Sequence, residues 1–387
     1  MYADYVIKNG RVIDPATGTN EVKDVVISGY RIVDPKGEEV TCPHVIDATD
    51  CLVVPGLIDF HCHLFSEGSN ICIHPDLMIP QGTVAAVDAG SAGTATFEAF
   101  YQNTIARSLV KIKTYLTLFA GGQLDPKAPE NFNHTLYNLS KAERLVDKYR
   151  DNILGFKIRL SKGVVPDDKA EEYLKGLIDQ AEEVSAKTGT NLGICIHTTN
   201  PPIDAGRIAE ILRPGDIYTH CYQGAGSTIV LEDGTIDPRV LEARRRGVIF
   251  DSANGKGNFG IKTCQKALAA GFYPDVISSD LTNDKFNMPP YAKNLLLVMS
   301  KYLSLGLPLT EVIRATTQKP AELMGLAGEI GTLKPGARAC VTVLKHKDVE
   351  VLHKDFQDDE FVGHDLLVNQ MTIIDGEIQY CQTDFWN

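Results

Sequence analysis

The chain has 387 residues, of which 43% are apolar, and its formal net charge at pH 7 is −12. This charge argues against nucleic acid or an anionic membrane as the main partner, because both require a basic face. No segment reaches the ~18 apolar residues that a membrane span needs, and the first residues lack the pattern of a secretion signal. We therefore expect a globular, cytoplasmic protein that binds neither nucleic acid nor a membrane.

The cysteine content supports the same location. Nine cysteines are present, an odd number, without a CxxC pair or a regular spacing. This pattern predicts neither a disulfide framework nor a structural zinc site, and it is typical of reduced, cytosolic thiols. The sequence is compatible with a homo-oligomer.

The chain begins with predicted β structure. Short apolar runs at residues 5–7, 11–14, 24–27 and 45–47 are separated by turn residues, and no helix is expected before residue 54. β character returns after residue 331, at 339–344 and 372–380, with acidic turns expected between these two runs.

Between these ends, short apolar strands alternate with longer helical patterns, as in parallel βα units. Strands are expected at residues 56–60, 83–89, 111–119, 154–160, 191–197, 216–220, 247–252 and 275–280. Helices are expected at 94–108, 170–187, 238–246, 257–270, 290–305 and 310–324. Eight strands with helices over ~250 residues match a (β/α)8 barrel. We predict an α/β protein with a TIM barrel at 55–330 and a small β-sandwich formed by 1–54 and 331–387.

The first barrel strand ends in two histidines, His61 and His63, separated by one residue. Residues i and i+2 of a strand project to the same face, so both imidazoles can reach one metal ion. Such a pair alone is a weak signal, because it is as often an ordinary surface feature.

Further polar residues end the later strands. Lys157 and Arg159 share one face of the fourth strand, His197 and His220 end the fifth and sixth, and Asp280 ends the eighth. Each has a simpler explanation: a rim lysine, satisfied core histidines or a capping aspartate. Because chemistry in such barrels sits at the carboxyl ends of the strands, their joint occurrence predicts a shared metal site.

In this pattern the chain resembles the amidohydrolase superfamily, and the likeness covers essentially its whole length. The terminal stretches 7–10 (IKNG), 54–59 (VPGLID) and 331–336 (GTLKPG) also match these proteins. Within the superfamily, the stretches 155–161 (GFKIRLS), 216–221 (DIYTHC) and 247–251 (GVIFD) are similar to the dihydroorotase-like amidohydrolase and deacetylase group. One departure is Cys340, where relatives usually have Asp; it lies in the predicted sandwich, away from the site.

The resemblance implies a ligand set for two divalent ions, zinc being the expected metal. His61, His63 and Asp280 would bind one ion, His197 and His220 the second, and Lys157 would bridge both as a carbamate. An ammonium group cannot bind a cation, but a neutral amine, favoured by burial and nearby positive charge, can add carbon dioxide. The resemblance further implies attack by a metal-bound hydroxide, with Asp280 as the catalytic residue that accepts and delivers the proton.

Substrate contacts are expected from residues that follow the ligands. The planar guanidinium of Arg159 suits a substrate carboxylate, although an ion pair with a neighbouring loop acid is an alternative. Thr199 and Tyr222 follow His197 and His220, and Asn254 lies in a glycine-rich loop (253–257); a second such loop is 90–93. Three cysteines adjoin ligands, and we expect them to serve packing: Cys62, Cys195 and Cys221.

Several functions fit this site. The favoured one is a deacetylase or amidohydrolase that cleaves an amide or ester of a small carboxylate-bearing substrate. A cyclic amidohydrolase of the dihydroorotase or hydantoinase type would use the same metals. A deaminase fits less well, because the resemblance associates deaminases with one metal and no lysine ligand. A non-catalytic homologue is disfavoured by the presence of all six ligand positions.

Overall fold

The computed structural model describes residues 1–125, 128–286 and 289–385, and a curled parallel sheet forms its centre. Seven strands pair in the order β14-β13-β12-β11-β10-β9-β8, so each strand lies beside its neighbour in sequence. Their bounds are β8 (Leu57–Cys62), β9 (Thr83–Gly93), β10 (Lys111–Thr117), β11 (Ile153–Arg159), β12 (Gly193–His197), β13 (Ile217–Thr219) and β14 (Ile249–Asp251). The predicted order of parallel strands is confirmed.

The eighth predicted strand, 275–280, forms single bridges in place of a regular ladder. One bridge joins Val276 to Asp251 of β14, and another joins Leu281 to Cys62 of β8, so this segment connects the two edges of the sheet. Asp280 has a φ of 50°, which interrupts the extended conformation that a ladder requires. The barrel therefore closes through individual hydrogen bonds at its last position.

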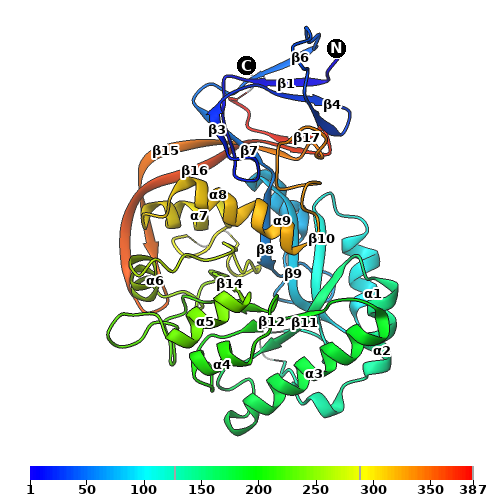
Figure 1. Ribbon diagram of the computed structural model, residues 1–387, viewed down its shortest axis with the longest axis vertical. Coiled ribbons are helices and arrows are strands. Elements are labelled where there is room, and N and C mark those ends of the chain that lie inside the picture. The colour runs from blue at the N-terminus through cyan, green and yellow to red at the C-terminus, as the bar shows by residue number, and fades with distance from the viewer. Residues whose placement is uncertain (126–127, 287–288, 386–387) are drawn as a thin grey trace.

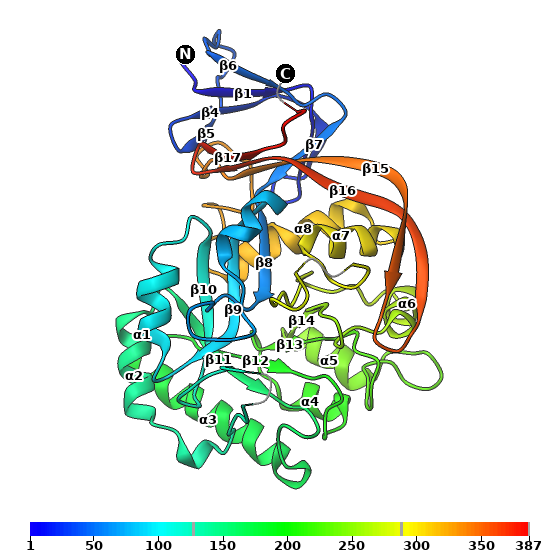
Figure 2. The same cartoon turned by 180° about the vertical axis from the view of Figure 1, so that it is seen from behind.

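Helices cover the outside of the sheet (Figures 1 and 2). In α3, buried side chains recur at the helical spacing, at Leu174, Leu177, Ala181 and Val184, because one face packs on the strands. The helices are α1 (Phe97–Phe100), α2 (Leu139–Lys148), α3 (Ala170–Thr188), α4 (Ala205–Ile211), α5 (Pro238–Arg246), α6 (Ile261–Ala269), α7 (Leu295–Ser304), α8 (Leu309–Thr316) and α9 (Gln318–Leu323). A π turn, η2 (Tyr101–Ile105), continues α1. Short 3-10 turns lie at η1 (Pro75–Gln81), η3 (His134–Leu136) and η4 (Asp167–Lys169).

The sequence pattern did not predict α2 and α4, and it joined α8 and α9 into one helix. Thr317, which separates α8 from α9, has φ −137° and ψ −78°, so the helix breaks there. Among the described residues, none of the helices has the length and apolar character needed to cross a membrane.

Two further sheets form a β region at one end of the molecule, where both chain ends lie (Figures 1 and 2). One has the order β5-β4-β1-β6 and the other β17-β16-β15-β7-β2-β3. Apolar residues of both sheets share one core, including Ile7, Ile27, Val53 and Val343. The strands are β1 (Tyr5–Lys8), β2 (Arg11–Asp14), β3 (Thr19–Val22), β4 (Val25–Ser28), β5 (Arg31–Val33), β6 (His44–Asp47), β7 (Cys51–Pro55), β15 (Val341–Lys354), β16 (Glu360–Ile374) and β17 (Glu377–Cys381).

A long hairpin, β15–β16, extends from the β region past α7 to α6 (Figures 1 and 2). The strands are longer than expected, because the chain stays extended from Val341 to Lys354 and returns from Glu360, and the expected acidic turns reduce to one at 355–359 in the hairpin tip. The middle of β15 is exposed and carries mostly polar side chains, so the sequence lacks the apolar pattern from which a strand is predicted. At the tip, Asp355 accepts a hydrogen bond from the Ile261 backbone N–H, at 2.7 Å, at the start of α6.

Candidate metal centre

His61 and His63, at the end of β8, present the same ring nitrogen to Asp280. The Nδ1 atom of His61 lies 3.3 Å from Asp251 Oδ2, and Nδ1 of His63 lies 2.9 Å from Ser91 Oγ. Their Nε2 atoms lie 3.7 Å and 3.5 Å from Asp280 Oδ1. The ligand atoms of these three buried residues all lie within 4.8 Å of one another, a geometry that can hold one metal ion.

The second histidine pair faces the first. Nδ1 of His197 lies 2.8 Å from Nε2 of His220, while Nδ1 of His220 lies 2.7 Å from the Ala253 carbonyl oxygen. That carbonyl requires a proton on Nδ1 of His220, which leaves Nε2 with a lone pair. The His61 and His220 rings are 5.2 Å apart between centroids, so the two pairs belong to one site.

Burial favours the neutral form of three of these imidazoles, those of His61, His197 and His220. Desolvation, reinforced by Lys157, holds the pKa of His61 well below its ordinary value, and desolvation with His220 does the same to the pKa of His197. Burial lowers the pKa of His220 to about 3. The neutral form is the one that binds a metal.

Lys157, on β11, points into the same group of residues. Its side chain is buried, and Nζ donates to Cys195 Sγ at 3.4 Å. Gly90 (φ 92°) makes room for it, because a Cβ there would lie 2.5 Å from the Lys157 Cβ. Cys195 thus faces the site on the same side of β12 as His197, but burial raises the pKa of its thiol to about 11, which disfavours the thiolate needed for metal binding.

The carboxylate of Asp280 is held on both sides. Oδ1 faces the histidines, and Oδ2 accepts hydrogen bonds from Asn258 Nδ2 at 2.6 Å and Lys285 Nζ at 2.9 Å. Burial would raise the pKa of Asp280, but Lys285, with His63 and two further histidines, holds it well below its usual value. The sequence interpretation missed Asn258 and Lys285, since both contacts depend on loop conformation.

Two of the predicted ligands occupy a backbone conformation that L residues rarely adopt. The φ angles of His220 and Asp280 are 58° and 50°. Such positions cost roughly 1–3 kcal/mol each and persist only where the surroundings fix them. The Asp280 N–H donates to the His61 carbonyl at 2.7 Å, and the Cys221 N–H donates to the Asp251 carbonyl at 3.2 Å.

Two buried aspartates support the ligands from behind. Asp251 orients His61 and accepts a hydrogen bond from Ser278 Oγ at 2.6 Å, and burial raises its pKa to about 7. Asp59 accepts hydrogen bonds from the backbone and side chain of Ser279, and burial raises its pKa to about 6. Asp251 could have been found from the sequence, because it ends a predicted strand as the ligands do.

Arg159 forms the ion pair that the sequence interpretation held as its alternative. Its Nε lies 2.8 Å from Glu130 Oε1, with 31% of the arginine side chain and 5% of the glutamate side chain exposed. Burial raises the pKa of Glu130, against the opposing charges of Arg159 and Lys157. Any role of Arg159 in binding a substrate therefore includes Glu130.

The other expected substrate contacts divide into three cases. Thr199 Oγ1 donates to Asn258 Oδ1 at 2.8 Å, so it contacts a neighbour of Asp280. Asn254 is fully buried, and neither of its side-chain polar atoms has a hydrogen-bond partner among the described residues. Tyr222 is fully buried and donates its hydroxyl to the Phe272 carbonyl at 2.7 Å, so it serves the core, contrary to the expectation.

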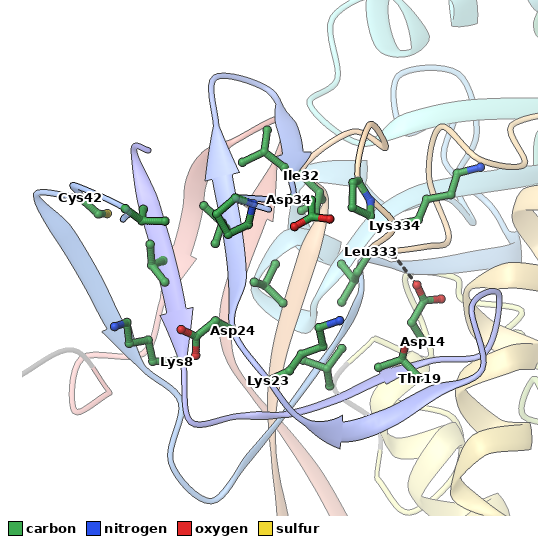
Figure 3. Close-up of a pocket in the computed structure, with 18 of the residues that line it drawn as sticks. Lys8, Asp14, Thr19, Lys23, Asp24, Ile32, Asp34, Cys42, Leu333 and Lys334 are labelled. Atoms are coloured by element: carbon green, nitrogen blue, oxygen red, sulfur yellow. Dashed lines mark hydrogen bonds between the residues drawn. The ribbon is translucent and has the colours of Figure 1, made fainter. Parts of the chain in front are cut away.

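A separate pocket of about 900 Å³ lies in the β region (Figure 3). Val6, Val12 and Ile32 line its apolar part, and Lys8 and Lys23 are among its charged residues. It contains none of the predicted metal ligands. The barrel site is defined by the converging ligands and is a different place in the fold.

Comparisons with known proteins agree with this fold. The amidohydrolase family matches residues 52–378. A curated relative, deacetylase Atu3266 of Agrobacterium fabrum, is 30% identical over 374 residues, which cover 93% of this chain and 87% of the relative. Among solved structures, a dihydroorotase matches with a TM-score of 0.81 at 26% identity, over 98% of both chains. An adenine deaminase matches with a TM-score of 0.86 at 23% identity, over 98% of this chain and all of that chain, which shows the shared fold.

The fold and the family match are those of a hydrolytic enzyme built on a TIM barrel. The chain belongs to the amidohydrolase family. The family resemblance and the barrel predicted from the sequence are both confirmed.

Proposed function

We propose that this protein is a binuclear metal-dependent deacetylase or amidohydrolase acting on a small carboxylate-bearing amide or ester. The observation that carries the proposal is the convergence of His61, His63, His197, His220 and Asp280 at one end of the barrel, with buried Lys157 beside them. The relative named deacetylase supports the reaction class.

The residues fit a pair of divalent ions. Neutral imidazoles and a carboxylate are the usual protein ligands of zinc, and the deprotonated oxygen of Asp280 is available because its pKa is held low. His61, His63 and Asp280 would hold one ion, and His197 and His220 the other. Bound there, the two ions would supply an activated water and would polarise the substrate carbonyl.

Lys157 would join the two halves of this site. Its amine is buried and acts electrostatically on one histidine of each pair, His61 and His197, and as a carbamate it would help to hold both ions. Gly90 supports this assignment, because only a residue without Cβ leaves room for the lysine stem. A positively charged amine at this position would repel both ions.

Asp280 would move the proton. Its Oδ1 faces the predicted metal position, so it can accept a proton from the attacking water and deliver it to the leaving group. Lys285 and Asn258 hold Oδ2, which fixes the direction in which Oδ1 points.

The substrate side of the site would use Arg159 and Asn254. The guanidinium of Arg159 is part exposed and would bind the substrate carboxylate, with Glu130 holding it in place. The buried amide of Asn254, without a partner among the described residues, would bind a polar substrate group. Thr199 contributes through Asn258, and Tyr222 is left out of the proposal.

A library of N-acetylated and O-acetylated carboxylic acids tests this function after the protein is loaded with zinc. We expect hydrolysis of at least one member and no hydrolysis by Lys157→Ala. Dihydroorotate and hydantoins belong in the same screen, because the solved dihydroorotase supports a cyclic amide as the second candidate. Release of ammonia from adenine without deacetylation would overturn the proposal.

A further inference from the structure

The loop after β14 reaches over the end of the barrel and touches Asp280. Within it, Asn258 Nδ2 donates to Asp280 Oδ2 at 2.6 Å. Gly255, with a φ of 51°, allows this approach, because a Cβ there would lie 2.5 Å from the same carboxylate oxygen. The loop is therefore shaped around Asp280.

A second bond fixes the orientation of the Asn258 amide. Thr199 Oγ1 donates to Asn258 Oδ1 at 2.8 Å, so the amide oxygen accepts from Thr199 and the amide nitrogen must face Asp280. Thr199 lies two residues after His197, and its backbone carbonyl in turn accepts a hydrogen bond from Ser161 Oγ at 2.7 Å. One side chain thus joins three loops at the mouth of the barrel.

The hairpin from the β region holds the same loop at its far end. Asp355 accepts from the Ile261 N–H at 2.7 Å, and it also accepts from two N–H groups of its own turn, those of Gln357 and Asp359. The Gly260 N–H donates to the Tyr222 carbonyl at 2.8 Å. The support for Asn258 therefore comes from both the barrel and the β region.

We infer that Asn258 is a positioning residue, oriented by Thr199, which holds Asp280 Oδ2 so that Oδ1 faces the metal ligands. This inference rests on the proposed function, in which Asp280 binds a metal. Lys285 also binds Oδ2, but its ammonium is a point charge without a preferred direction, whereas the planar amide of Asn258 is held at both ends. Groups in this position behind a metal ligand typically change metal affinity by 10–100-fold when removed.

The test is the zinc dissociation constant of the full-length protein, measured by competition with a chromophoric chelator. We expect Asn258→Ala to weaken the tighter site about 10–100-fold. Thr199→Val should weaken it by less, and the double variant should equal Asn258→Ala, because Thr199 acts only through Asn258. Asn20→Ala, which removes a similar amide that binds Arg11 in the β region, should leave zinc affinity unchanged.

The outcomes separate this inference from the proposed function. Zinc affinity within about twofold of the wild type in Asn258→Ala would overturn the inference while leaving the function intact. Additive losses in the double variant would also overturn it, since they would show that Thr199 acts independently. A wild-type protein that takes up no zinc would refute the proposed function itself.

The kinetics at saturating zinc give a second test. Asn258→Ala should lower kcat and leave KM unchanged; a rise in KM alone would assign Asn258 to substrate binding and reject the positioning role.

Discussion

Nδ1 of His197 and Nε2 of His220 lie 2.8 Å apart, each directed at the other across the gap between β12 and β13. Because both imidazoles are neutral, the proton between them belongs to Nδ1 of His197, and it must move to Nε2 of the same ring before a metal can bind both atoms. Metal uptake should therefore release no proton from this pair near neutral pH, which calorimetry of zinc binding in buffers of different ionisation enthalpy measures.

Metal content is the first quantity to measure. Protein purified without chelator should contain about two divalent ions per chain, because the ligands form two sets. His61→Asn should lose the ion of the first set, as measured by plasma emission. Replacement of exposed His364 by Asn should leave both ions in place. A wild-type content near zero, unchanged in His61→Asn, would contradict the two-ion site.

Lys157→Ala should abolish hydrolysis, because it removes the group that bridges the two halves of the site. A short-chain carboxylate in the buffer should restore part of the activity by occupying the bridging position. Turnover of the acetylated substrate, measured with and without added formate or acetate, checks both statements. Wild-type turnover in Lys157→Ala would show that the lysine is not a ligand.

Arg159 must be tested together with Glu130. Removing the arginine alone would leave a buried carboxylate unpaired, which costs about 3–5 kcal/mol of stability. The double variant Glu130→Gln/Arg159→Met should therefore be compared with the single variant Glu130→Gln, in which no buried carboxylate is left unpaired. In the double variant, kcat/KM for the carboxylate-bearing substrate should be lower than in Glu130→Gln by roughly two to three orders of magnitude. This is the fall expected for a loss of ~2–5 kcal/mol of transition-state binding.

A neutral acetyl ester supplies the control for Arg159. Its hydrolysis should survive in both variants, because the metal ligands and Asp280 are untouched. Arg159→Lys should retain only part of the activity on the anionic substrate, since a point charge lacks the planar fork of the guanidinium. Equal losses on neutral and anionic substrates would show that the arginine supports the site or the fold.

Lys301 on α7 predicts a pH dependence of stability. Its side chain is fully buried, Nζ lies 4.6 Å from the centre of the Phe259 ring, and burial lowers its pKa to about 8, against the charges of Cys264 and Asp355. An unfolded lysine titrates near 10.4. Between about pH 8 and 10.4 the unfolded state binds more protons, so the free energy of unfolding should rise with pH.

Lys301→Met removes the titrating amine, so a comparison of the variant with the wild type isolates the contribution of Lys301 to the pH dependence of stability. The difference in unfolding free energy between the variant and the wild type should shrink by about 2 kcal/mol from pH 7 to pH 10. The variant should be the more stable protein at pH 7, where the folded wild type keeps a buried charge. Urea unfolding at the two pH values measures the difference, and parallel curves would contradict the assignment.

The sequence was sufficient to predict seven of the barrel strands and to place together the polar side chains that follow them. Parallel strands place their carboxyl ends at one edge, so His61, His197, His220 and Asp280 could be grouped without coordinates. Asn258 and Lys285 could not be grouped in this way, because each reaches Asp280 through an irregular loop. The β15–β16 hairpin was underestimated because its exposed strands lack the apolar alternation that marks a half-buried sheet.

The pairing of β7 with β15 has a consequence for biosynthesis. β7 ends at Pro55, and its partner β15 begins at Val341, so almost the whole barrel is synthesised between two adjacent strands. While the ribosome makes the barrel, the edge of β7 that faces β15 is an unpaired template for strands of other chains. A nascent chain stalled before Val341 should thus be prone to aggregation even when its barrel is complete, and a chaperone that covers residues 51–55 during translation should raise the yield of native protein.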